Sequence, residues 1–195
     1  MVIQGVYLQI MGGVSVESDK YEDVVKAAQQ IFQKEATLGL GDFKKRKPQQ
    51  VSEQKYDELL KSGDYIEVFH GGAHDITGKY YVNNDLHVNG FGYYFSYNDS
   101  TASSYTNGGS VVSALIKKSD IMSSPSYWSS EHNEGVEKYI GKNATFKNGK
   151  EISNSYKHDL YNSSTLAARK GFKVVESNNS AVVVVDRSVL IMKKK

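Results

Sequence analysis

The sequence predicts an α+β fold in which helices come first and short strands follow. Residues 1–63 hold two segments whose apolar residues recur with helical spacing. From residue 64 onward the apolar segments are short, rich in β-branched and aromatic residues, and separated by Gly, Asn, Asp and Ser. We therefore expect an N-terminal strand and helical region over residues 1–63 and a mainly antiparallel β domain with small helices over residues 64–195.

The chain is expected to begin with a strand and a long helix. Residues 1–11 are fairly apolar but lack the basic start and the small-residue cleavage site of a secretory signal, so we interpret them as a strand. Residues 19–38 carry apolar side chains on one helical face. Ser18 or Asp19 is placed to cap this helix, and Gly39 to end it.

A loop and a second helix follow. Residues 39–50 contain glycines, a proline and the basic run 44–47, a composition typical of a loop. Ser52 is placed to cap a helix that ends at residues 62–64. The apolar side chains that share one face of this helix are Tyr56, Leu59 and Leu60.

The second part is predicted to consist of short strands and short helices. The strands are expected at residues 65–70, 92–95, 110–117, 172–175, 181–186 and 189–192. The helices are expected at residues 99–106 with Asp99 as N-cap, at 134–140, and at 163–170 with Gly171 closing the last one. Residues 143–154 are interpreted as an exposed loop.

Composition excludes several kinds of site. The chain has no cysteine, which excludes a disulfide scaffold, a cysteine-based zinc site and a thiol nucleophile. The five histidines are irregularly spaced, so no metal site is expected. Residues 128–137 are interpreted as the start of a surface helix, or as a loop on the side of the molecule that faces the target. The formal net charge of +2 argues against a nucleic-acid partner, and the basic runs 44–47 and 193–195 are interpreted as a solvated loop and tail rather than binding patches. No apolar run is long enough for a membrane span.

Two segments carry residues that suit a binding site. The first ends in His70 followed by Gly71, where glycine permits a close approach of the backbone to a ligand, although a structural histidine before an ordinary turn gives the same pattern. The second is the glycine-rich aromatic run 90–96, followed by a helix that carries Tyr105. One interpretation is a core strand followed by a surface helix, and the other is a slot in which a flat ring lies between Tyr94 and Tyr105. These are two of the 14 tyrosines in the sequence.

These motifs, taken in order, resemble the ADP-ribosyltransferase superfamily, in its histidine-tyrosine-glutamate branch that includes the poly(ADP-ribose) polymerases and diphtheria-type toxins. The layout of residues 47–60, leading into the His70-Gly71 strand, is also similar to transferase domains of phage head-morphogenesis proteins and bacterial toxins, although those relatives often have Arg-Gly where this chain has His70-Gly71. The resemblance covers residues 48–191 and rests on Phe69-His70-Gly71, Gly90-x-Gly92-x-Tyr94-Phe95, Ser100-x-Ala102-x-x-Tyr105, and the final stretches 167–175 and 182–186.

The resemblance implies split antiparallel sheets with short helices, and NAD as the substrate. It implies that His70 binds a ribose hydroxyl of NAD and that the Gly71 backbone pairs with the nicotinamide carboxamide. Tyr94 and Tyr105 would stack on the nicotinamide, and Ser96 at the end of the aromatic strand is included among the NAD-binding residues. At Ala102, where relatives have a small hydroxyl residue, Ser100 or Ser103 is expected to supply the hydroxyl.

The chain departs from the family at the catalytic acid. The family's glutamate stabilises the charge that develops as nicotinamide leaves, which a neutral residue cannot do. Ala181 aligns with that position, and Glu176 lies just upstream. Three explanations stay open: Glu176 is the catalytic acid together with His70 and Tyr94, the acid has been replaced by alanine, or the protein binds without catalysing.

The leading expectation is therefore a mono-ADP-ribosyltransferase, a phage- or toxin-associated effector that transfers ADP-ribose from NAD to a macromolecule in the cytoplasm of a host cell. The expected acceptor is protein rather than nucleic acid, and no membrane partner is expected. The first alternative is a catalytically inactive binding module of the same fold that acts on a protein partner. The second is an interaction protein whose tyrosines are unrelated to NAD.

Overall fold

The computed structural model describes residues 17–72, 74–82, 90–106, 109–123, 129–141, 143–177 and 180–194. The strand predicted at residues 1–11 lies outside these ranges. Within them, eight strands form one sheet in the order β1-β8-β4-β2-β3-β7-β6-β5. The strands are β1 (Gln49–Val51), β2 (Tyr65–His70), β3 (Tyr93–Ser96), β4 (Val112–Lys117), β5 (Ile121–Met122), β6 (Val174–Ser177), β7 (Ala181–Val184) and β8 (Ile191–Lys193).

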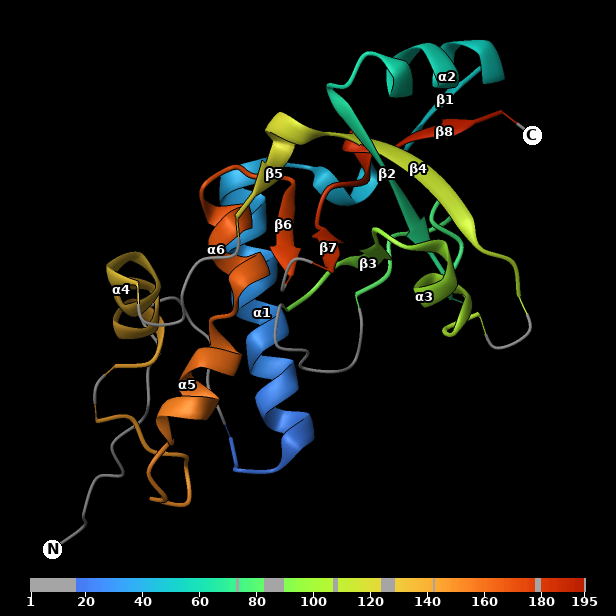
Figure 1. The fold of residues 1–195 in the computed structure, drawn as a ribbon. Helices are drawn as coiled ribbons and strands as arrows, with labels where there is room; N and C mark the ends of the chain where they lie inside the picture. Colours follow the sequence, from blue (N-terminus) through green and yellow to red (C-terminus); the bar gives the residue numbers. More distant parts are fainter. Residues whose placement is uncertain are drawn as a thin grey trace, which may run out of the picture.

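Helices surround this sheet (Figure 1). The α-helices are α1 (Tyr21–Leu40), α2 (Glu53–Lys61), α3 (Asp99–Ser103), α4 (Ser130–Tyr139), α5 (Asn154–Leu160) and α6 (Ser163–Arg169). Three 3₁₀ turns, η1 (Phe43–Lys45), η2 (Lys118–Asp120) and η3 (Arg187–Val189), lie in the connections. The predicted α+β class is confirmed.

The sheet is mixed and continuous, which corrects the predicted split antiparallel sheets. β1 pairs with β8 in parallel, and β5 pairs with β6 in parallel, while the other pairs are antiparallel. Parallel neighbours need a long connection, and the chain between β5 and β6 supplies one with three helices. The two halves of the sheet meet where β2 and β3 pair at one position, Phe69 with Ser96. The sheet is therefore narrowly joined at β2 and β3.

The first predicted helix exists, but its ends differ. Lys20 occupies the N-cap position without a side-chain capping bond, and the hydroxyl of Ser18 bonds the Asp23 carboxylate. The helix continues through Gly39 and ends at Leu40, and Gly41 follows as the C-cap residue with φ 65°. A Cβ at residue 39 would lie 1.9 Å from the Ala168 carbonyl oxygen. Gly39 thus allows α1 to pack closely against α6 and does not end the helix.

The other elements follow the prediction in part. Ser52 caps α2 by accepting a hydrogen bond from the Lys55 backbone nitrogen, and Gly171 adopts φ 83° after α6, both as expected. α3 is capped by Asn98 instead of Asp99, and α4 begins at Ser130, earlier than predicted. Strands β1 and β5 and helix α5 were not predicted, and α5 begins at Asn154, the last residue of the segment 143–154 that was expected to be a loop.

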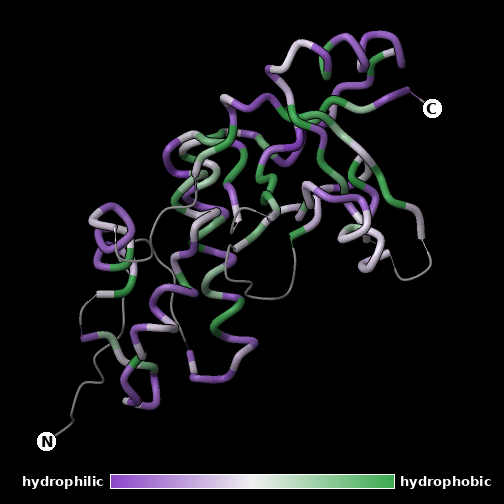
Figure 2. Tube along the Cα trace, viewed as in Figure 1, coloured by the Kyte–Doolittle hydropathy of each residue, from purple (hydrophilic) through white to green (hydrophobic). Residues whose placement is uncertain are grey.

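The residues on either side of position 63 share the sheet and the core. β1 pairs with β8, and the apolar face of α1 packs into one cluster with residues of α4, α5 and α6. Figure 2 shows α1 alternating between hydrophobic and hydrophilic residues along its length, as expected for a helix with one buried face. Residues 17–63 are thereby integrated into the same fold as the rest of the described chain.

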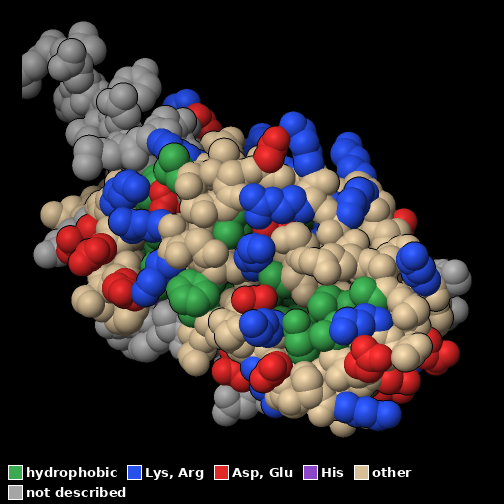
Figure 3. Space-filling view, turned by 90° about the horizontal axis from the view of Figure 1, so that it is seen from above, with side chains coloured by type: hydrophobic (Ala, Val, Ile, Leu, Met, Phe, Trp, Pro, Cys, Tyr) green, Lys and Arg blue, Asp and Glu red, His purple; other side chains and the backbone are tan. Residues whose placement is uncertain are grey.

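The basic run 44–47 takes part in the structure. Arg46 forms an ion pair with the fully buried Asp186, and Lys47 donates to the carbonyls of Thr77 and Gly78. Lys45 pairs with the exposed Asp42. On the face drawn in Figure 3, lysines and arginines are interspersed with aspartates and glutamates, so this face carries both signs of charge.

Candidate functional site

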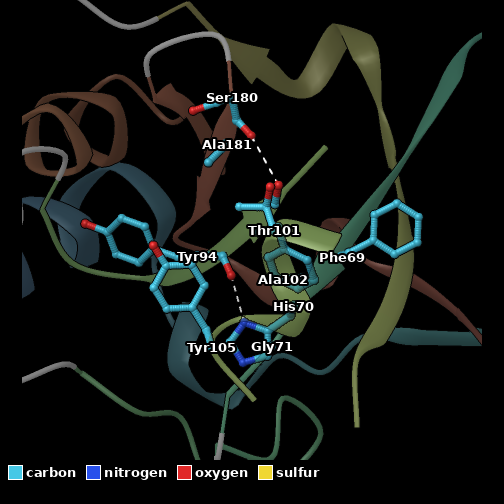
Figure 4. A pocket seen from close by; sticks show the side chains of 11 residues that line it. Phe69, His70, Gly71, Tyr94, Thr101, Ala102, Tyr105, Ser180 and Ala181 are labelled. Atoms are coloured by element: carbon cyan, nitrogen blue, oxygen red, sulfur yellow. Dashed lines mark hydrogen bonds between the residues drawn. The ribbon is translucent and has the colours of Figure 1, made fainter. Parts of the chain in front are cut away.

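A cavity of about 440 Å³ opens beside the junction of β2 and β3 (Figure 4). Its walls come from the end of β2, from β3, from α3 and the turn after it, and from the start of β7. The lining residues are Phe69, His70, Gly71, Tyr94, Phe95, Ser96, Thr101, Ala102, Tyr105, Ser180 and Ala181. Five of them are the residues predicted from sequence to bind NAD.

His70 is held at the junction by a backbone bond. Its Nδ1 lies 2.7 Å from the carbonyl oxygen of Tyr94, and only 8% of the residue is exposed. A carbonyl can only accept, so Nδ1 carries the proton. Burial lowers the pKa of His70, which favours the neutral ring. Nε2, the acceptor in this tautomer, is buried and has no hydrogen-bond partner among the described residues.

Gly71 is required by packing. A Cβ at this position would lie 1.7 Å from the carbonyl oxygen of Ala102 in α3. The glycine after His70 therefore lets α3 pack onto the end of β2 and close one side of the cavity. This is a structural reason for the glycine, in addition to the backbone contact implied by the family resemblance.

Tyr94 and Tyr105 supply the aromatic surface of the site. Tyr94 is half-buried on β3, and its hydroxyl donates to the carbonyl oxygen of Gly90 at 2.8 Å. Tyr105 lies after α3, is 66% exposed, and lines the same cavity as Tyr94 (Figure 4). One ring is thus anchored and the other borders the open side, an arrangement that suits a flat ligand entering from solvent.

Ser96 and Thr101 place hydroxyl groups on the lining. The Ser96 hydroxyl donates to the carbonyl oxygen of Ser180 at 3.4 Å and accepts from the Asn98 nitrogen at 3.0 Å. It joins the end of β3 to the turn before β7. Of the hydroxyls near Ala102, that of Thr101 lines the cavity. The predicted Ser100 and Ser103 do not line it.

The side chains of Ser100 and Ser103 instead bond locally within α3. The Ser100 hydroxyl donates to the Asn98 side chain, and the Ser103 hydroxyl donates to the Asp99 carbonyl oxygen. Successive side chains on a helix point about 100° apart, so the hydroxyl that faces the cavity depends on how the helix is rotated. The sequence does not specify that rotation.

The structure does not bring Glu176 into the cavity. Glu176 pairs with Val182, whereas Ala181 pairs with Ser96. Paired residues share a face and successive residues alternate, so the Glu176 side chain lies on the face opposite to Ala181. Its carboxylate accepts from the hydroxyl of Tyr97 at 3.3 Å. Burial, and then the Glu176 charge, raise the pKa of Tyr97 to about 12.

The catalytic role expected for Glu176 is thus not supported by its position. Ala181 lines the cavity where the family resemblance calls for glutamate, and no Asp, Glu, Lys or Arg occurs among the described lining residues. The site offers aromatic surface, a neutral imidazole acceptor and backbone groups. These groups can hold a flat ring and a hydroxyl donor, but they cannot stabilise a developing positive charge as a carboxylate does.

The predicted surface segment 128–137 contributes in part to the core. A helix does begin here, at Ser130, and its residues 130, 131, 133, 134 and 137 are exposed, but His132 is fully buried and its Nε2 bonds the carbonyl oxygen of Tyr161. Burial lowers the pKa of His132 to about 4. Glu131 instead pairs with Lys170 on the surface. In the part of the chain that the structure describes, no group of three His, Asp or Glu could hold a metal ion.

Comparison with known proteins adds no relative. No family model matches the chain, and no curated protein or solved structure matches it either. Among the described residues, no helix combines the length and apolar character needed to cross a membrane.

Proposed function

We propose that this protein binds NAD in the cavity beside β2 and β3, with the nicotinamide ring against Tyr94 and Tyr105. The observation that supports the proposal is the meeting of His70, Gly71, Tyr94 and Tyr105 on one cavity, although they come from three separate segments. A ribose hydroxyl would donate to Nε2 of His70, the acceptor that has no partner among the described residues. The cavity volume, about 440 Å³, falls within the range of small-molecule sites.

The proposed function is binding without rapid ADP-ribose transfer. Breaking the bond between nicotinamide and ribose leaves positive charge on the sugar, which a nearby carboxylate stabilises in enzymes that cleave glycosidic bonds. Ala181 occupies the position where that carboxylate is expected, and Glu176 faces the other side of the sheet. These two placements favour the binding module over the transferase among the alternatives.

Isothermal titration calorimetry with NAD and with nicotinamide tests the proposal. We expect Tyr105→Ala to weaken binding about fivefold or more, since base–aromatic stacking contributes about 1–3 kcal/mol. Tyr105→Phe should retain most of the affinity because the ring is kept. The melting temperature should change little in either variant, because Tyr105 is 66% exposed.

Two outcomes would contradict the proposal. One is the absence of a binding signal for wild-type protein with either compound at millimolar concentration. The other is equal affinity in wild type and Tyr105→Ala, which would place the ligand elsewhere. Leu38→Ala, at a residue that is 71% exposed on α1, serves as a matched surface control.

ADP-ribosyl transfer to a protein acceptor is the second candidate. It is supported by the exposed position of Tyr105, because an acceptor could approach a nicotinamide ring held beside it. In that reaction the bond between nicotinamide and the ribose carbon breaks, nicotinamide leaves, and the acceptor loses a proton as it bonds to that carbon. Labelled NAD incubated with a lysate tests this candidate, and the absence of transferred label and of released nicotinamide would exclude it.

A further inference from the structure

The anchored tyrosine of the cavity is held through residues that lie outside the cavity. The Tyr94 hydroxyl donates to the Gly90 carbonyl oxygen at 2.8 Å. Tyr105 is mostly exposed, so Tyr94 is the wall whose position depends on the protein interior. The position of this wall therefore depends on what holds Gly90.

Gly90 is held by the start of α6. It adopts φ 92°, and a Cβ there would lie 2.0 Å from Oδ1 of Asn162 and 2.3 Å from Oγ of Ser164. The next backbone nitrogen, that of Phe91, donates to Ser164 Oγ at 2.7 Å. Only glycine fits against these two side chains, and its neighbour is fixed by the serine hydroxyl.

The direction of the Ser164 hydroxyl is itself determined. Its proton is donated to Asn162 Oδ1 at 3.0 Å, which leaves the oxygen lone pairs to accept from Phe91. Asn162 Oδ1 also caps α6 by accepting from the Thr165 nitrogen and hydroxyl. Ser164 and Thr165 are fully buried and Asn162 is 1% exposed, so water does not compete for these bonds.

From this chain of contacts we infer that Ser164 is a positioning residue that fixes the Tyr94 wall of the ligand cavity from outside it. The inference rests on the NAD-binding function proposed above. Ser164 acts through the Phe91 nitrogen and the Gly90 carbonyl, and it does not touch the ligand. The α6 helix, which packs against α1 and β6, thereby sets the geometry of a cavity formed by β2, β3, α3 and β7.

The matched pair Ser164→Ala and Thr165→Val tests the inference. Both remove a buried hydroxyl bonded to Asn162 Oδ1, but only Ser164→Ala also removes the acceptor of the Phe91 nitrogen. 3-Fluorotyrosine placed at position 94 reports on the ring by fluorine NMR without any ligand. We expect its resonance to shift or broaden in Ser164→Ala and to stay at the wild-type position in Thr165→Val.

Nicotinamide affinity gives the second readout. Ser164→Ala should weaken binding about tenfold, and Thr165→Val should leave it within about twofold of wild type. In a Tyr94→Phe background, which lacks the hydroxyl anchor, Ser164→Ala should add less than about a twofold loss. If Ser164→Ala fails to fold, Ser164→Cys, which keeps the branching of the side chain and offers only a weak acceptor, replaces it in every comparison.

An unchanged fluorine resonance in folded Ser164→Ala would overturn the inference, as would equal changes in Ser164→Ala and Thr165→Val. If the resonance shifts only in Ser164→Ala while wild-type protein binds neither nicotinamide nor NAD, the positioning role stands and the proposed binding function fails. The two proposals are therefore tested separately.

Discussion

The three histidines whose pKa is lowered by burial make stability depend on pH. His132 is the most affected, with a pKa lowered to about 4, and the pKa values of His70 and His158 are lowered for the same reason. The unfolded chain binds protons on these residues near pH 6.5, whereas the folded chain does not until lower pH. Their contribution to stability is therefore present above pH 6.5 and is lost as pH falls.

We predict that the free energy of unfolding falls between about pH 6.5 and pH 4, with about 3 kcal/mol of the loss due to His132. Below about pH 4 His132 adds nothing further to the pH dependence of the free energy of unfolding. His132→Gln, which can still donate to the Tyr161 carbonyl, should flatten the dependence. Urea unfolding of both proteins at several pH values measures the difference, and parallel curves would contradict the assignment.

Sequence reasoning located most of the candidate site at the level of single residues. His70, Tyr94, Ser96 and Tyr105 were named from short motifs, and all four line the cavity with Gly71. Glu176 was named from its nearness in sequence to Ala181, and its side chain lies on the other face of the sheet. Successive side chains along a strand point to opposite faces, so the pairing register determines which face carries Glu176. A single sequence does not specify that register.

At the scale of elements, the start of β7 is where the chemistry of the site can be changed. Ala181 is the first residue of β7, lines the cavity and is only partly buried, so a longer side chain has room to point into it. Glu176 lies on the neighbouring strand β6 and faces away. Positions 181 and 176 therefore form a matched pair for testing on which face of the sheet a carboxylate affects the release of nicotinamide.

We predict that Ala181→Glu increases the release of nicotinamide from NAD by about tenfold or more, because the carboxylate would stabilise the positive charge on the ribose. Glu176→Gln should leave the slow wild-type rate unchanged. Chromatography of nicotinamide over time measures both rates. A loss of activity in Glu176→Gln, or no gain in Ala181→Glu with the fold intact, would contradict the assignment of the two faces.

The elements that sequence reasoning missed are those that depend on distant partners. β1 and β5 are three and two residues long and exist because β8 and β6 lie beside them. Helix α5 is short and largely polar, and it is recognised mainly by Ser153 accepting from the Tyr156 nitrogen. By contrast, α1 and α2 have long or well-capped amphipathic patterns, and these local signals were sufficient.

At the scale of the whole molecule, the two halves of the sheet meet narrowly at the candidate site. β2 and β3 pair only at Phe69 and Ser96, and the bond from His70 Nδ1 to the Tyr94 carbonyl oxygen provides a further contact across this junction. The cavity lies where the strands diverge. The residues that line the cavity thus come from both halves of the sheet, and the alignment of the halves determines the geometry of the cavity.

Arg187, which is buried, and Arg46, which is partly exposed, join parts of the chain that are distant in sequence. Arg187 is fully buried and donates to the carbonyl oxygens of Ile76, Gly78 and Lys44 at 2.7, 3.0 and 3.2 Å. Arg46 pairs with the buried Asp186. The sequence alone favoured a solvated loop for residues 44–47, because the partners of these cations could be identified only from the folded chain.

The central claim is that the cavity between the two sheet halves holds the nicotinamide part of NAD. A crystal structure of the protein grown with nicotinamide tests it most directly. We predict electron density for a planar ring against Tyr94 and Tyr105, with its carboxamide near the backbone of Gly71. Density for the ring at another site, or an empty cavity in crystals containing millimolar nicotinamide, would contradict the claim.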